Sequence, residues 1–203
     1  MNRHLFFTIT ACVITGLTPL IFTEKDNILM FISIALAALF LQVYWRDILV
    51  QALVVRGRLA VKSGDYKKLR DSYEKIHRLL PRSFAGKMAM GVIHSLQENW
   101  AHAESYFRQA IYYKPGNLYA CLNLSVVLLR REHYHEVIKL LKALIFAYPG
   151  SIQAYKLLAE ACYGLGRLHE ACHYLKAARL IDCRDPEIQR FISIIEQEID
   201  QAA

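Results

Sequence analysis

Two histidines and a glutamate in the last third of the chain have the spacing of a catalytic zinc site. Residues 169–173 read His-Glu-Ala-Cys-His. On a helix, His169 and His173 would be one turn apart and share a face. In this pattern the two histidines bind zinc and the glutamate, here Glu170, activates a water molecule. The segment is therefore a candidate metallopeptidase motif.

A second spacing covers much more of the chain. Pro81, Pro115 and Pro149 are thirty-four residues apart, and a fixed period of this length is typical of a solenoid built from helix pairs. A proline cannot continue a helix, so each one is expected just after the end of a helix. The period predicts an all-α fold in which each unit packs on the next.

The residue types inside the period are specific. Gly91, Ala103, Phe107 and Ala110 precede Pro115 at the positions where a tetratricopeptide repeat has its small and large core residues. Residues 50–183 therefore resemble a tetratricopeptide-repeat (TPR) protein with about four repeats, of which the first is degenerate. The resemblance implies a solenoid over 48–183, with units at about 50–83, 84–117, 118–151 and 152–183.

The repeat also offers another explanation of the 169–173 motif. Gly166-Arg167 followed by Glu170-Ala171 resembles the ordinary start of the second helix of a repeat. That helix belongs to the outer layer of a solenoid, where no cleft is expected to hold a metal. The chain also has no phosphate-binding loop, nucleophile elbow or paired-carboxylate motif. We therefore expect no enzyme activity, metal or cofactor, and keep the metallopeptidase as an alternative.

The carboxyl end reads as a capping helix. Asp185, Pro186 and Glu187 provide an N-cap, a first-turn proline and a first-turn acid. Isoleucines and Phe191 recur on one face of the helix that follows, at about 186–200. A solenoid needs such a cap because its last repeat otherwise exposes an apolar edge. Residues 184–203 are predicted to be this helix and a tail.

The amino-terminal region, residues 1–47, has a different composition. Residues 5–23 and 28–45 contain no charged side chain, and as helices of about 1.5 Å rise per residue each would nearly cross a bilayer core of about 30 Å. Tyr44 and Trp45 come before Arg46 and Asp47, as interfacial aromatics followed by charge. We predict two transmembrane helices joined as a hairpin by residues 24–27.

Two cleaved forms compete with this hairpin. A signal peptide needs a basic start and a small-residue cleavage site, but only Arg3 is present and no such site precedes the second apolar run. Ile9 to Cys12 is similar to a lipoprotein processing site, although the apolar stretch before it is short. A secreted or lipidated repeat protein is therefore kept as an alternative.

The net charge of +7 is concentrated after the second apolar run. Residues 46–82 contain ten basic and four acidic side chains. The positive-inside rule then places both termini in the cytoplasm, in a multi-pass protein of a bacterial inner or plasma membrane. The basic cluster can also contact anionic lipids. It contains no nucleic-acid-binding motif and few aromatics, so no nucleic-acid partner is expected.

The five cysteines give no metal or disulfide signature, since their number is odd and no C-x-x-C occurs. Cys162 falls at a core position of its repeat, where cysteine behaves as a small apolar residue. Free cysteines are typical of a reducing compartment.

The predicted function is protein binding. In the TPR solenoids that the chain resembles, the first helix of each repeat lines the concave face, where partners bind. This implies an apolar groove with basic ends that suits a peptide or an amphipathic helix. The carboxylate clamp of chaperone-tail receptors is incomplete, because Val54 and Val92 replace polar residues. The predicted groove residues are Arg58, Lys62, Met88, Val92, Leu96, Tyr119, Leu122, Asn123, Val126, Arg130, Lys156, Glu160 and Tyr163.

From these observations we predict a membrane-anchored scaffold that binds an unidentified protein or peptide at the cytoplasmic membrane surface. Assembly of a membrane complex would be one use for it. The architecture is similar to bacterial inner-membrane proteins that combine two amino-terminal spans with cytosolic repeats.

Overall fold

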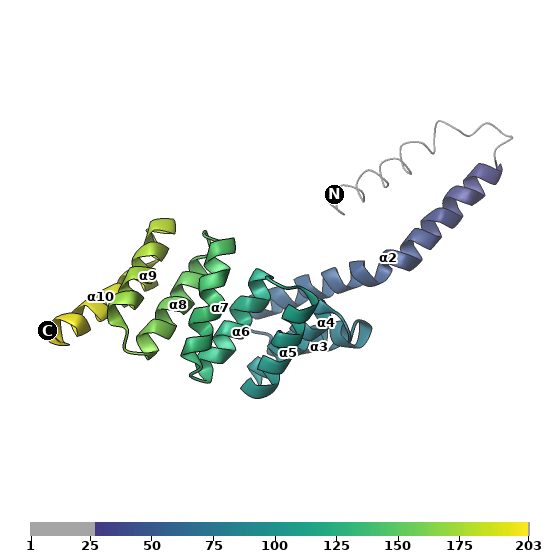
Figure 1. The fold of residues 1–203 in the computed structure, drawn as a ribbon. Coiled ribbons are helices and arrows are strands. Elements are labelled where there is room, and N and C mark those ends of the chain that lie inside the picture. The colour runs from purple at the N-terminus through teal and green to yellow at the C-terminus, as the bar shows by residue number, and fades with distance from the viewer. Residues whose placement is uncertain (1–26, 203) are drawn as a thin grey trace. The chain divides into compact units, whose positions relative to one another are not determined.

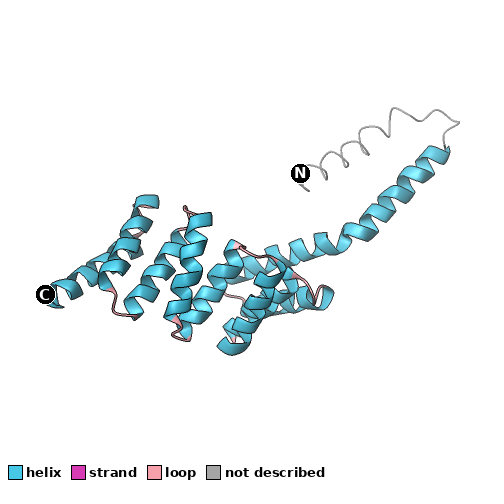
Figure 2. Cartoon of the chain, viewed as in Figure 1, coloured by secondary structure: helices cyan, strands magenta, loops and turns pink. Residues whose placement is uncertain are grey.

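The computed structural model describes residues 27–202, which form helices joined by short turns and contain no strand (Figure 2). Contacts divide the chain into two compact units, Met1–Ala52 and Leu53–Ala203, and α2 belongs to both. In the second unit the helices follow one another in chain order (Figure 1). The helices are α2 (Asn27–Lys62), α3 (Tyr66–Leu79), α4 (Phe84–Leu96), α5 (Trp100–Tyr113), α6 (Leu118–Arg130), α7 (Tyr134–Ala147), α8 (Ile152–Gly164), α9 (Leu168–Ile181) and α10 (Pro186–Ala202).

The thirty-four-residue period sets where helices begin and end. The first helices of successive pairs, which we call A helices, begin at Phe84, Leu118 and Ile152. Ser83, Asn117 and Ser151 cap them, each accepting a hydrogen bond from a backbone N–H of the first turn. The second or B helices, α3, α5, α7 and α9, each end two residues before Pro81, Pro115, Pro149 or Cys183.

The turn from A to B helix requires a left-handed residue at one fixed position. Gly64 and Gly166 have φ values of 70° there, and Glu98 and Glu132 have 56° and 60°. Glycine adopts this region without the steric cost that a side chain brings. The two middle turns are therefore made by residues that are less suited to them than those of the outer turns.

Close A–B contact depends on small residues facing large ones. A Cβ added to Gly91 in α4 would lie 2.5 Å from Cε1 of Phe107 in α5, and the Phe107 ring is fully buried. Leu141 and Leu175 are equally buried at the corresponding positions of α7 and α9. Burial of these side chains at about 25 cal/mol per Å² of apolar surface is the main favourable term in stacking the repeats.

Helix α10 covers the end of the solenoid, as the sequence predicts. Ile188, Ile192 and Ile195 are buried on the face that joins the hydrophobic core. Asp185, just before the helix, accepts a hydrogen bond from the Glu187 N–H. On the polar side of α10, Glu187 pairs with Lys156 of α8 and Glu196 pairs with Lys176 of α9.

The amino-terminal prediction differs from the structure in one respect. The sequence predicts a membrane span at 28–45 that stops at Arg46-Asp47, whereas α2 runs unbroken from Asn27 to Lys62 through both charges. Within residues 27–202, no helix combines the length and the apolarity needed to cross a membrane. A separate span at 28–45 is thus not supported, and the predicted span at 5–23 lies outside the described residues.

Candidate partner-binding groove

The predicted groove residues fall into rows that repeat across the A helices. Met88, Leu122 and Lys156 are thirty-four residues apart, on α4, α6 and α8. Helix α6 packs against both α4 and α8, so equivalent side chains on the three helices are neighbours. We call this surface the A-helix face. Two further rows are Arg58, Val92, Val126 and Glu160, and Lys62, Leu96 and Arg130.

Several apolar side chains of the A-helix face are exposed. Leu96 is 45% exposed, Val126 is 40% exposed and Tyr119 is 63% exposed. Leu96 ends α4, Tyr119 is near the start of α6 and Val126 is further along α6. Exposed apolar side chains on one surface are a typical mark of a binding site. The half-buried apolar residues between them, which pack on the core beneath, are Met88, Val92 and Leu122.

Basic side chains belong to the same rows as these apolar residues. Arg58 and Lys62 are exposed near the end of α2, and Arg130 is exposed at the end of α6. Asn123 is half-buried, and its side-chain nitrogen donates to the carbonyl oxygen of Tyr119 at 2.9 Å. Asn123 therefore stabilises its own helix as well as facing the surface.

The far end of the predicted groove is occupied by the cap. Lys156 donates to Asp185 at 3.2 Å and to Glu187 at 2.5 Å. Its hydrogen bond to Glu187 raises the pKa of Lys156, burial acts in the opposite direction, and Asp185 raises it further. Lys156 is thus ion-paired and is not available to a partner in this structure.

Tyr163 is held by the same cap. Its hydroxyl donates to Glu198 at 2.7 Å, which raises the pKa of Tyr163, and its ring meets Phe191 edge-on at 5.6 Å between centroids. Of the three predicted groove residues on α8, Glu160 alone is exposed. The candidate binding surface therefore runs from α2 to α6, and it is shorter than the sequence predicted.

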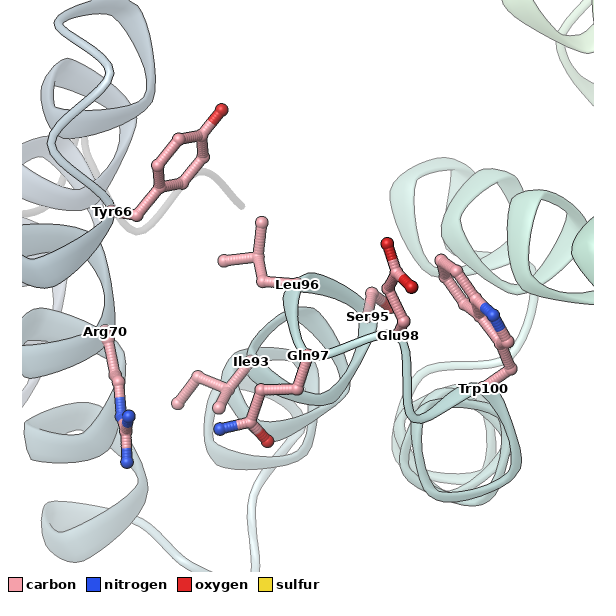
Figure 3. Close-up of a pocket in the computed structure, with 8 residues that line it drawn as sticks. All are labelled: Tyr66, Arg70, Ile93, Ser95, Leu96, Gln97, Glu98 and Trp100. Atoms are coloured by element: carbon pink, nitrogen blue, oxygen red, sulfur yellow. The ribbon is translucent and has the colours of Figure 1, made fainter.

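A pocket that the sequence analysis did not identify adjoins this surface. It has a volume of about 450 Å³ and lies where α3, the end of α4 and the start of α5 meet (Figure 3). Leu96 connects it to the A-helix face. Arg70, which brings a charge to one wall, is paired with Glu74 at 2.9 Å. The lining residues are Tyr66, Arg70, Ile93, Ser95, Leu96, Gln97, Glu98 and Trp100.

Comparison with another repeat gives the physical reason for the pocket. Tyr134 begins α7 and its ring lies on Gly164, where an added Cβ would stand 2.5 Å from Cε1 of the tyrosine. In the first repeat the equivalent residues are Tyr66 and Leu96. Leu96 has a side chain where Gly164 has none, and Tyr66 is 62% exposed. Leu96 and Gly164 are two periods of thirty-four residues apart, so alignment of the repeats could have revealed the difference between them.

The zinc motif takes the form of an ordinary helix segment. His169 and His173 are exposed on α9, and Ala171 and Cys172 are buried. The Arg167 Nε donates to Glu170 at 2.6 Å, so the would-be catalytic carboxylate is ion-paired. Among residues 27–202 there is no group of three or more metal-ligating side chains that could hold an ion. The described cysteines, Cys121, Cys162, Cys172 and Cys183, are free thiols.

Solved structures identify the fold. A PilF structure from Pseudomonas aeruginosa aligns at a TM-score of 0.69 and 16% identity, over 77% of this chain and 71% of that one. A MamA fragment from Desulfovibrio magneticus RS-1 aligns at 0.63 and 17%, over 75% and 86%. The first TPR domain of RPAP3, bound to an HSP90 peptide, aligns at 0.56 and 14%, over 58% and 94%.

The all-helical, TPR-like fold predicted from the sequence is confirmed. Identities this low establish the architecture alone. No family model and no curated protein matches the chain.

Proposed function

We propose that this protein is a scaffold that binds an amphipathic helix or extended segment of a partner protein on its A-helix face. The observation that carries the proposal is the set of exposed apolar residues Leu96, Tyr119 and Val126, together with the exposed basic residues Arg58 and Lys62 in the same rows on α2. An amphipathic segment with acidic residues on its margin would match both features. The peptide bound by the RPAP3 domain is consistent with ligand binding by this architecture.

In this proposal the chain has no catalytic role. Glu170 would be needed by a metallopeptidase, whereas in a scaffold it only pairs with Arg167 on the outer layer. Glu170→Gln should therefore leave the biological activity of the protein unchanged. Loss of that activity in Glu170→Gln, with the fold retained, would favour the enzyme.

We further propose that residues 1–47 anchor the scaffold to a bacterial inner or plasma membrane, with the repeats in the cytoplasm. This proposal is supported by the uncharged runs at 5–23 and 28–45 and by the ten basic side chains in 46–82, which can contact anionic lipids. Ile34 and Leu36, 56% and 59% exposed on α2, are also suited to a lipid environment.

Topology and anchoring are tested by one cysteine added after Ala203. A membrane-impermeant thiol reagent should label it only after the cells are opened, and the chain should stay with membranes in alkaline carbonate. Labelling in intact cells would refute the cytoplasmic placement. Release by carbonate would refute the anchor.

Binding is tested by a photoreactive amino acid at Tyr119, which is exposed on the A-helix face near the start of α6. It should crosslink one protein partner in cells, and mass spectrometry should identify the bound segment. Gln109, exposed on α5, is the matched control position. Equal crosslinking of the same partner from positions 119 and 109 would contradict binding at the A-helix face.

A further inference from the structure

Three large apolar side chains stand almost fully exposed at the ends of the B helices. Tyr112 on α5 is 84% exposed, Phe146 on α7 is 92% exposed and Leu180 on α9 is 89% exposed. They are thirty-four residues apart and so hold the same position in three successive repeats. At 100° per residue, Phe146 points about 200° from the buried Leu144. The row therefore lies on the outside of the helix layer.

Such high exposure distinguishes this row from the A-helix face. A residue that lines a groove is shielded by the walls, as Val126 is at 40% exposed. Side chains exposed by more than four-fifths project from the surface instead. Tyr113 and Ile181, the last residues of α5 and α9, and Tyr148, just after α7, add further apolar surface at 42%, 41% and 39% exposed. Projecting aromatic and aliphatic residues are suited to insertion into the interfacial region of a lipid bilayer.

The charge of the same layer is positive. The three helices that carry the row, α5, α7 and α9, have five basic and three acidic side chains, a net charge of +2. Helix α3 adds five basic and two acidic side chains, with Arg78 at the position of the row. Lys139 and Lys142, on α7 before Phe146, form no ion pair within the described residues. The acidic residues that are neutralised by arginine are Glu74, Glu104, Glu136 and Glu170.

We propose that this outer B-helix face docks flat on an anionic lipid bilayer, with Tyr112, Phe146 and Leu180 inserted at the headgroup level. Apolar and aromatic residues on a basic helical surface are the features by which proteins bind a membrane interface. Anionic headgroups would neutralise Lys139 and Lys142, and the three apolar side chains would be buried at the boundary between headgroups and acyl chains. The A-helix face would remain free for a partner. The inference requires neither the groove nor the anchor to be correct.

The test uses the full chain with Cys12→Ser and Cys183→Ser and an environment-sensitive NBD label on Phe146→Cys. The protein is mixed with vesicles of phosphatidylcholine, alone or with phosphatidylglycerol. With phosphatidylglycerol, NBD emission should shift to the blue and its quenching by aqueous iodide should fall severalfold. The label on Glu132→Cys, at an A–B turn, is the matched control and should stay accessible, because any anchor tethers both positions equally.

Charge variants test the choice of lipid. Lys139→Gln with Lys142→Gln should restore most of the iodide quenching at position 146, and Arg130→Gln on the A-helix face should not. Equal quenching at positions 146 and 132 would overturn the proposal, as would shielding that does not depend on phosphatidylglycerol. Shielding in lipid-free detergent, together with a dimer mass by light scattering, would show a second copy on this face and also overturn it.

Discussion

The Phe107 ring fills the space that a side chain on Gly91 would need, with its Cε1 only 2.5 Å from the position of an added Cβ. The ring is fully buried in the hydrophobic core. This contact sets how closely α4 approaches α5, and hence how the second repeat supports its part of the A-helix face.

We expect Gly91→Ala to destabilise the protein by about 1–3 kcal/mol, the usual cost of overpacking a tight core. Thermal unfolding followed by circular dichroism would measure the change. Gly150→Ala is the control, because a Cβ there meets nothing within 4 Å, and it should change stability by less than about 0.5 kcal/mol. If Gly91→Ala changed stability as little as Gly150→Ala does, the contact between Gly91 and Phe107 would not limit the approach of α4 to α5.

Replacement of Glu132 by glycine is expected to stabilise the protein, in contrast to Gly91→Ala. It occupies the left-handed turn position that Gly64 and Gly166 occupy in the outer repeats. A residue with a side chain is strained by about 1–2 kcal/mol in the left-handed region, which exceeds the entropy cost of about 0.5–1 kcal/mol that glycine brings. Glu132→Gly should therefore stabilise the fold by about 0.5–1 kcal/mol in chemical unfolding. Glu132→Ala keeps the strain, and an equal gain in that variant would contradict the explanation.

Glu104 links two repeats through charge. It pairs with Arg108 of its own helix at 2.8 Å and with Arg131, and Arg108 reaches Glu136 of the next repeat at 2.7 Å. Burial alone would raise the pKa of Glu104, but hydrogen bonds from Arg108 and Arg131 outweigh it, and the pKa falls below its ordinary value of 4.5.

A lowered carboxyl pKa stabilises the folded state above pH 4.5, and that contribution is lost as the pH falls through the folded value. Glu104→Gln should thus destabilise the protein by about 1–2 kcal/mol at pH 7. The difference from the wild type should shrink below pH 4. Glu160→Gln, on an exposed residue, is the control. A difference that persists unchanged at pH 3 would rule out the charge link.

Alanine substitutions at the neighbouring residues Ile194 and Ile195 test whether α10 stabilises the end of the solenoid. Ile195 is fully buried against the last repeat, and Ile194 is 42% exposed. Ile195→Ala should cost about 2–4 kcal/mol and lower the unfolding temperature by several degrees. Ile194→Ala should cost much less. Equal effects would mean that α10 does not close the solenoid.

Much of the fold could be predicted because the repeat imposes the same residue type at the same position. The prolines marked the ends of B helices, and Gly91 with Phe107 marked the close contact between helices. Asp185-Pro186-Glu187 marked the cap because capping chemistry is local. The continuity of α2 could not be foreseen, because Arg46 and Asp47 look like a stop signal but are compatible with a helix.

The site was harder to predict for a related reason. The repeat frame places Lys156 and Tyr163 on the A-helix face, but it does not show that Asp185, just before α10, and Glu198, within it, contact them. The pocket beside Leu96 depends on a difference between repeats, Leu96 against Gly164, whereas a periodic pattern reports what repeats share. Contacts made by segments outside the repeats, such as the cap, determine which of the predicted groove residues are available to a partner.

The most direct test of binding at the A-helix face is the affinity of the full chain for the partner segment found by crosslinking at position 119. Val126→Glu puts a charge at a partly exposed apolar position of the A-helix face. In isothermal titration calorimetry it should weaken binding at least about ten-fold, or about 1.4 kcal/mol. Ser105→Glu, exposed on α5, should bind like the wild type. Unchanged affinity in Val126→Glu, with the fold intact, would contradict the proposal.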